Sequence, residues 1–136
     1  THFFRIATVY VILDGLRLTL AVWFVRPEDE LVDILSLLLH RVQRQGLAIR
    51  RLWLDRGFAN VEIFDYLRRA GFGAVVACPI RGKTGGTRAL CHGRGSYTTV
   101  HEFYRPGFGY CRVKVAVVRV GAEGTRPLRW MVAIVG

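Results

Sequence analysis

Residues 48–80 constrain the fold most strongly, because two strand patterns and one helix pattern follow one another there with short connections. The segment 48–55, AIRRLWLD, predicts a short strand that ends in an aspartate. Asn60 can cap a helix over 61–70. The segment 74–80, AVVACPI, is continuously apolar, which is typical of a strand covered on both faces. A strand, a crossover helix and a second strand together predict an α/β fold.

The residues before this region predict an antiparallel hairpin and a helix. Residues 2–13 are rich in β-branched and aromatic side chains, and apolar and polar residues alternate over 16–25. Between them lies Asp14-Gly15, a two-residue hairpin signal, because glycine accepts the positive φ that such turns need. Apolar residues then recur at helical spacing over 28–45, with acidic residues at the start and arginines near the end.

The pattern changes after residue 80. Residues 81–96, RGKTGGTRALCHGRGS, are rich in glycine, basic and without periodicity, which indicates a loop or a mobile arm. Three strand-like runs without an intervening helix come next and predict an antiparallel meander; they span 97–104, 109–120 and 127–135. We therefore expect a partial α/β core over 1–80, a basic loop over 81–96 and an antiparallel β insertion over 97–136.

The charge of the chain points to a polyanionic partner. Among 136 residues, 20 Lys and Arg face 10 Asp and Glu, which gives a formal net charge of +10. Most of the cations are Arg, whose planar guanidinium matches the geometry of phosphate. Nucleic acid is the first expectation and an anionic membrane surface the second. A basic protein without such a partner is the alternative that charge alone leaves open.

The cysteines and the hydropathy of the chain indicate in which cellular compartment the protein is expected. The three cysteines match neither a disulfide framework nor a paired metal-binding motif, so a reducing cytoplasm is expected; they are Cys78, Cys91 and Cys111. No run reaches the roughly 18 uncharged apolar residues of a membrane span. The first residues lack the features of a signal peptide. Both ends of the sequence fall in apolar runs, and we expect the chain to be part of a longer protein.

Asp55 is the main candidate for a catalytic residue on physical grounds. It ends a predicted strand and comes just before a glycine and a helix start. Open α/β sheets bind their ligands at the carboxyl ends of their strands. A carboxylate there can hold a divalent cation. The alternative is that Asp55 only begins a turn or caps the next segment, and position alone does not decide between the two.

The phrase Leu54-Asp55-Arg56-Gly57-Phe58, followed by a helix, an apolar strand and a basic RGK, resembles DDE transposases of prokaryotic insertion sequences. The similarity is greatest to the group whose catalytic core is interrupted by a β-rich insertion. The opening THFFRIATVYVILDG resembles the second and third strands of that core, which form a hairpin. The resemblance covers most of residues 1–80, and the β-rich part only in outline.

The resemblance implies a ribonuclease H-like fold, a mixed sheet with crossover helices that is incomplete at both ends. Asp55 is then the second acid of an Asp-Asp-Glu triad that holds Mg²⁺ or Mn²⁺. The first Asp is expected upstream of Thr1 and the Glu beyond Gly136. Two metal ions about 3.5–4 Å apart clamp the attacking and leaving oxygens at phosphorus. One carboxylate cannot build that clamp, so we expect this chain alone to be inactive.

The resemblance also implies DNA as the partner, both transposon ends and target, and a homodimer of the full-length protein acting at the nucleoid. The expected contacts with DNA phosphates are basic residues beside Asp55 and in the loop, namely Arg56, Arg81, Lys83, Arg88 and Arg94. The alternative for the loop is a solvated surface whose charge only aids solubility. For the whole protein, the alternatives are a structure-specific nuclease on the same fold or a non-catalytic nucleic-acid-binding domain.

Overall fold

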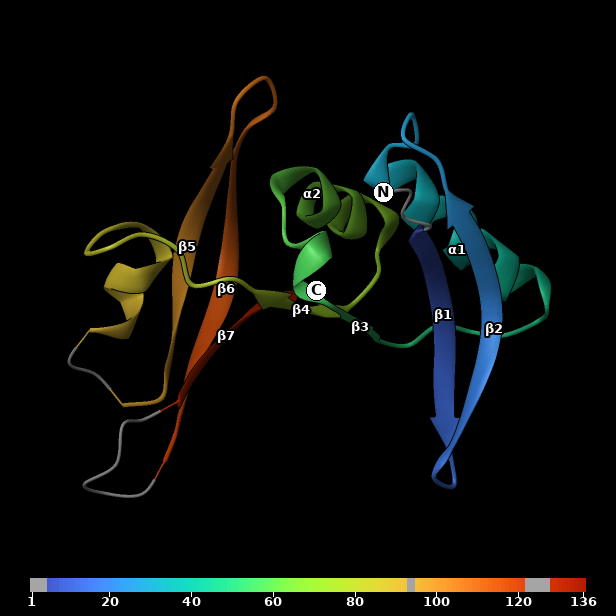
Figure 1. Ribbon diagram of the computed structural model, residues 1–136, viewed down its shortest axis with the longest axis horizontal. Coiled ribbons are helices and arrows are strands. Elements are labelled where there is room, and N and C mark those ends of the chain that lie inside the picture. Colours follow the sequence, from blue (N-terminus) through green and yellow to red (C-terminus); the bar gives the residue numbers. More distant parts are fainter. Residues whose placement is uncertain (1–4, 93–94, 122–127) are drawn as a thin grey trace. The chain divides into compact units, whose positions relative to one another are not determined.

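The computed structural model describes residues 5–92, 95–121 and 128–136 (Figure 1). The chain divides into two compact units, which we call unit 1 (Thr1–Ile49) and unit 2 (Arg50–Gly136). Among the described residues, unit 1 has a two-stranded sheet and unit 2 a mixed five-stranded sheet. Both units also contain helix, so the protein has a mixed α/β architecture.

Unit 1 begins with an antiparallel hairpin of β1 (Arg5–Leu13) and β2 (Leu16–Val25). The connecting residues Asp14 and Gly15 both have positive φ, 50° and 77°. Positive φ at both central positions is the signature of a type I′ turn, whose twist matches that of the flanking strands. The hairpin predicted from Asp14-Gly15 is therefore confirmed.

The helix of unit 1, α1 (Leu31–Arg44), covers one face of this hairpin. Its apolar residues are spaced by about one turn, so they form a single stripe. The stripe packs on the inward-facing residues of both strands and makes a small core. The buried members of this core are Ala21, Ile34, Leu38 and Val42, and Ala7, Val9, Leu20, Trp23, Val25 and Ile49 pack against them partly buried.

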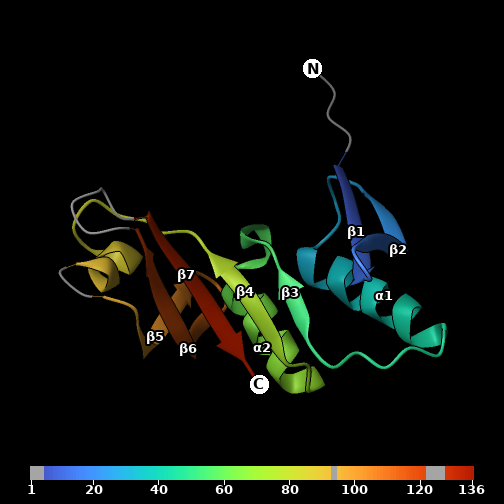
Figure 2. The ribbon, with the colours of Figure 1, turned by 90° about the horizontal axis from the view of Figure 1, so that it is seen from below.

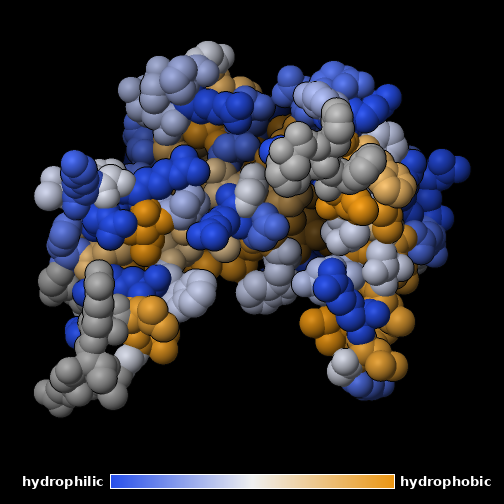
Figure 3. Space-filling view, viewed as in Figure 1, coloured by the Kyte–Doolittle hydropathy of each residue, from blue (hydrophilic) through white to orange (hydrophobic). Residues whose placement is uncertain are grey.

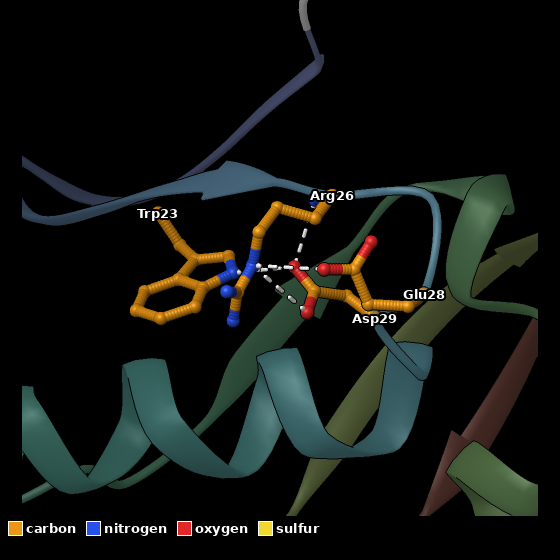
Figure 4. Close-up of polar contacts among 4 residues, drawn as sticks. All are labelled: Trp23, Arg26, Glu28 and Asp29. Atoms are coloured by element: carbon orange, nitrogen blue, oxygen red, sulfur yellow. Dashed lines mark hydrogen bonds and ion pairs between the residues drawn. The ribbon is translucent and has the colours of Figure 1, made fainter.

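The helix starts three residues later than the sequence pattern suggested, because Asp29 is used in a turn before it. One carboxylate oxygen of Asp29 accepts hydrogen bonds from the indole nitrogen of Trp23, at 3.0 Å, and from the backbone N–H of Arg26, at 2.8 Å (Figure 4). The guanidinium of Arg26 also lies 3.5 Å from its other oxygen. The carboxylate thus joins the end of β2 to the approach to α1 instead of lying in the first helical turn.

Unit 2 is built on a sheet in the order β3-β4-β7-β6-β5 (Figure 2). The first two strands are parallel and all other neighbours are antiparallel. Two short 3₁₀ helices lie in the connections, η1 (Arg56–Phe58) and η2 (Gly86–Cys91). The strands are β3 (Leu52–Leu54), β4 (Ala74–Cys78), β5 (Tyr97–Arg105), β6 (Gly109–Val120) and β7 (Leu128–Val135).

The helix α2 (Val61–Ala70) connects the two parallel strands and packs on one face of the sheet. Asn60 caps its start by accepting the N–H of Ile63, and Gly71 ends it with a φ of 78°. Both ends were expected from the sequence and both are confirmed. The ring of Phe64 is fully buried and lies 5.0 Å from that of Phe103 on β5.

The strands after residue 96 do not form a sheet of their own. Instead β7 lies between β4 and β6, with Cys78 opposite Met131 and Ala74 opposite Val135. The described strands of the expected core over 1–80 are divided between two sheets, and the expected insertion over 97–136 continues the sheet of β3 and β4. The physical reason is burial: in both strands alternate residues are buried, among them Met131, Ala133 and Val135 of β7 and Ala74, Val76 and Cys78 of β4.

Candidate functional site

Asp55 lies where the sequence predicted, directly after β3, and its side chain is exposed. Its Oδ1 accepts the backbone N–H of Gly57 at 2.8 Å, which caps the short helix η1. A Cβ atom at position 57 would lie 3.0 Å from that same oxygen. Glycine at this position therefore leaves room for the carboxylate to bend back onto the chain. This geometry gives Asp55 a structural role that does not depend on any metal.

Asp55 also has the exposure that a metal ligand needs. Gly57 is its one hydrogen-bond donor among the described residues, so Oδ2 stays open to solvent. A carboxylate oxygen of this kind is a ligand that Mg²⁺ and Mn²⁺ accept. Within the described ranges, no three His, Cys, Asp or Glu side chains are grouped so that they could hold a metal ion. Asp55 would therefore contribute one ligand to a site that needs others.

The two basic residues closest in sequence to the strand ends differ in their surroundings. Arg56 is the first residue of η1 and is exposed. Arg81 follows β4 by three positions; its backbone N–H donates to the hydroxyl of Thr87, and its side chain is exposed. Neither guanidinium pairs with a carboxylate in the part of the chain that the structure describes. Both cations thus remain able to meet a phosphate.

The other predicted phosphate contacts lie farther along the loop. Lys83 is exposed, whereas the guanidinium of Arg88 donates to the backbone oxygens of Gly82 and Ile80. Arg88 thereby holds the loop together and has fewer donors left for a ligand. Arg94 lies outside the described residues.

The segment expected as an irregular, mobile arm contains ordered structure. Residues 86–91 form η2, and the side chain of Cys91 is buried. The hydroxyl of Tyr97 donates to the carbonyl oxygen of Leu90 at 2.5 Å, which ties the end of η2 to β5. Two glycines explain why the sequence shows no periodicity here. Gly82, before η2, and Gly86, its first residue, have φ values of 100° and 62°, which are open mainly to glycine.

Unit 2 contains a pocket of about 490 Å³, and some of its lining residues follow Asp55 closely in the sequence. Its wall includes Ala59 and Asn60, just after η1, and Pro79, just after β4. The facing wall comes from β5, and Arg81 and Thr87 supply polar groups from the loop. The full lining is Ala59, Asn60, Val61, Pro79, Arg81, Gly86, Thr87, His101, Glu102, Phe103, Tyr104 and Arg105.

Two pocket residues on β5, Phe103 and Arg105, were not singled out in the sequence. His101, Phe103 and Arg105 alternate along the strand and share the face turned to α2, since Phe103 contacts Phe64 and Arg105 pairs with Glu62 at 3.2 Å. Their spacing of two residues within a predicted strand could be read from the sequence. What could not be seen was which helix this face would meet.

No protein-family model matches the chain, and comparison with curated proteins gave no match. In the described part of the chain, no helix has both the length and the apolar character needed to cross a bilayer.

Proposed function

We propose that this chain is part of the catalytic core of a DDE-type DNA transposase, in which Asp55 is a ligand of Mg²⁺ or Mn²⁺. The observation that carries the proposal is the position of Asp55 at the carboxyl end of β3, a strand parallel to its neighbour and joined to it by α2. Parallel α/β sheets bind ligands at this edge. An exposed carboxylate there suits metal-dependent chemistry at phosphorus.

The order of the elements supports a ribonuclease H-like core. A hairpin, a helix, a strand, a second helix and a second strand follow one another, in the order that the resemblance implies. The net charge of +10 and the exposed guanidinium groups of Arg56 and Arg81 favour a nucleic-acid substrate. By the same resemblance, the full-length protein works as a homodimer on DNA in the prokaryotic cytoplasm.

In this proposal Asp55 would hold a metal ion, and the bound metal would supply the activation of water for cleavage and of the new 3′ hydroxyl for joining to target DNA. The carboxylate of Asp55 holds one side of the metal site, and the exposed arginines bind phosphate oxygens. An upstream Asp and a downstream Glu supply the remaining carboxylates, so residues 1–136 alone are expected not to cleave DNA.

Asp55→Asn tests the metal role without removing the cap. Asn is as good as Asp at the start of a helix, because its side-chain oxygen accepts the same backbone N–H. In the full-length protein that contains these residues, we expect Asp55→Asn to lower Mn²⁺-dependent cleavage of element-bearing plasmid by more than about 100-fold, since losing even an outer-shell partner of a metal ligand costs about 10–100-fold. Asp65→Asn, which changes a helix acid paired with Arg69, is the matched control and should cleave normally.

The products decide between a transposase and a structure-specific nuclease. A transposase yields element ends joined to new target DNA, whereas a nuclease yields hydrolysed ends alone. Cleavage without joined product would contradict the transposase proposal but leave the role of Asp55 intact.

A non-catalytic nucleic-acid-binding domain is the second candidate, and the hydrogen bond from Gly57 to Asp55 favours it. In that case the carboxylate serves only as a cap. Asp55→Asn would then leave the activity of the full-length protein unchanged, and Asp55→Ala would lower its thermal stability.

A further inference from the structure

The wall of the pocket beside η1 includes Arg81, but most of its other lining residues have no role in the function proposed above. Apolar groups from Val61, Pro79 and Phe103 make up part of its wall, and two arginines reach it from different elements. Pockets for small ligands and ligand fragments commonly measure about 300–1,000 Å³ and combine an apolar wall with a few polar groups. At about 490 Å³ this pocket lies within that range.

Arg105 forms an ion pair with Glu62 and is still partly exposed to solvent. Nε of Arg105 lies 3.2 Å from Glu62 Oε1, and the Arg105 side chain is 47% exposed. A guanidinium carries five N–H donors, so one carboxylate contact does not use them all. The contact also links Arg105 on β5 to α2, which restricts the side chain before any ligand binds. An arginine held by one side of its fork and open on the other is suited to accept a phosphate.

Arg81 brings a second cation to the same pocket from the loop after β4. Its backbone is fixed by the hydrogen bond from its N–H to Thr87 and by the bond that its carbonyl accepts from the N–H of Arg88. Its guanidinium has no carboxylate partner among the described residues. Glu102 also belongs to the lining, but strand alternation turns it away from the face that Phe103 and Arg105 share.

We infer that this pocket binds a phosphodiester group of a single DNA strand, with Arg105 and Arg81 as its phosphate ligands and Phe103 as part of an apolar wall for the adjoining sugar and base. The inference rests on the proposed function, since it supplies the contact that would hold a strand beside Asp55. Asn60 and Ala59 of the pocket follow Asp55 by only a few residues, and Pro79 follows β4, whose end lies beside that of β3.

The test measures binding of a fluorescein-labelled single-stranded DNA 12-mer by anisotropy, with EDTA present so that no metal site contributes. Arg105→Gln and Arg81→Gln should each weaken binding about fivefold or more. Each should also reduce the magnitude of the slope of log K against log salt concentration by about 0.7, the value for one phosphate contact on a single strand.

Two matched variants separate a local contact from a general effect of charge or folding. Arg69→Gln removes the same charge from α2 and also breaks an ion pair, with Asp65 at 2.7 Å. It should change the affinity less than twofold. Glu62→Gln breaks the pair with Arg105 but leaves the cation, so its affinity should be equal to or higher than that of the parent chain.

Three results would overturn the inference. One is equal weakening by Arg69→Gln and Arg105→Gln. Another is weakening by Glu62→Gln as large as that by Arg105→Gln, which would show that the pair only supports the fold. The third is displacement of the 12-mer by a deoxynucleoside monophosphate at equal concentration, which would make the pocket a site for free nucleotides. In EDTA, the Asp55→Asn variant should bind the 12-mer as tightly as the parent chain does. Failure of the pocket inference would therefore leave the cleavage test of Asp55 valid. Failure of the cleavage test would likewise leave the binding test of the pocket valid.

Discussion

The sheets of units 1 and 2 are buried to different extents. In unit 2, α2 covers a five-stranded sheet, and Phe64, Val76 and Val115 are fully buried. In unit 1, a single helix covers one face of a two-stranded sheet, and Phe24 on that sheet is 68% exposed. Figure 3 shows hydrophobic side chains gathered over the half of the hairpin near its turn; the exposed ones there are Ile12, Leu13, Leu16 and Leu18.

The difference indicates that unit 2 is stabilised mainly by its tertiary core, and unit 1 mainly by a local turn and local hydrogen bonds. A two-stranded hairpin is marginally stable alone, and small domains bury a smaller fraction of their surface on folding than large ones do. Unit 1 therefore relies on the type I′ turn at Asp14-Gly15 and on the bonds of Asp29 to fix its geometry. Unit 2 relies on packing, so its stability should respond most to changes of core volume.

The largest expected effect is that of Phe64→Ala in unit 2. Removal of a fully buried ring leaves a cavity under α2 and should lower the free energy of unfolding by about 3–5 kcal/mol. Urea denaturation followed by far-UV circular dichroism measures this loss. Phe24→Ala is the same chemical change at an exposed site of unit 1 and should cost less than about 0.5 kcal/mol. Equal losses would remove the contrast between the units.

Leu38→Ala should have the next largest effect, in unit 1. Leu38 is 2% exposed and lies at the centre of the small cluster on α1, so its loss should cost roughly 2–3 kcal/mol. Hydrogen exchange read by mass spectrometry should show faster exchange in β1, β2 and α1. Exchange in α2 and β4 should stay as in the parent chain. Faster exchange there as well would contradict the division into two units.

Alkaline pH should weaken unit 2 through Cys78. Burial raises the pKa of the Cys78 thiol from 9.0 to about 11, since the charged thiolate is disfavoured away from water. The stability linked to the protonated thiol is complete below pH 9 and is lost as the pH rises toward 11, by at most about 2 kcal/mol. Stability measured at pH 8 and pH 10.5 gives this loss. Cys78→Ala should show a smaller drop between the two pH values; an unchanged drop would place its origin elsewhere.

Acid should act on unit 1 through Asp29, with the smallest effect of the four. The backbone N–H of Arg26, then the indole of Trp23, hold the pKa of Asp29 below its ordinary value of 3.8. A lowered pKa in the folded state gives stability that is present above about pH 4 and is lost as the pH falls through the folded value. NMR of the Trp23 indole proton between pH 6 and pH 2 should follow this loss.

Asp29→Asn should flatten that acid response, because the titrating group is gone. Glu30→Gln removes a neighbouring charge but leaves the bond between Trp23 and Asp29, so it should keep the response. A response that persists unchanged in Asp29→Asn would assign it to another group.

Local signals in the sequence predicted the local structure well. Asp14-Gly15 predicted the hairpin, and Asn60 with Gly71 predicted both ends of α2, because each acts on its own backbone. The start of α1 was missed because Asp29 bonds to Trp23, six residues away, and helical periodicity carries no information on such a contact.

Partners far apart in the sequence could not be predicted. The strand-like run over 127–135 predicted a strand, but such a run cannot say that β7 lies beside β4. Burial of β4 on both faces was expected, yet Val75 and Ala77 on its second face are only half-buried. At the site, the position of Asp55 after a strand was predictable and its catalytic role remains a prediction. Arg105 escaped notice because its pairing with Glu62 needs β5 and α2 to meet.

The place of β7 in the sheet has a consequence for how the chain is made. Because β7 lies between β4 and β6, the sheet of unit 2 cannot be completed until residue 135 has been synthesised. At roughly 5–20 residues per second, β4 waits on the order of 3–11 s for this neighbour. During that time one edge of β4 presents free N–H and C=O groups, the kind of edge to which chaperones and other nascent chains bind.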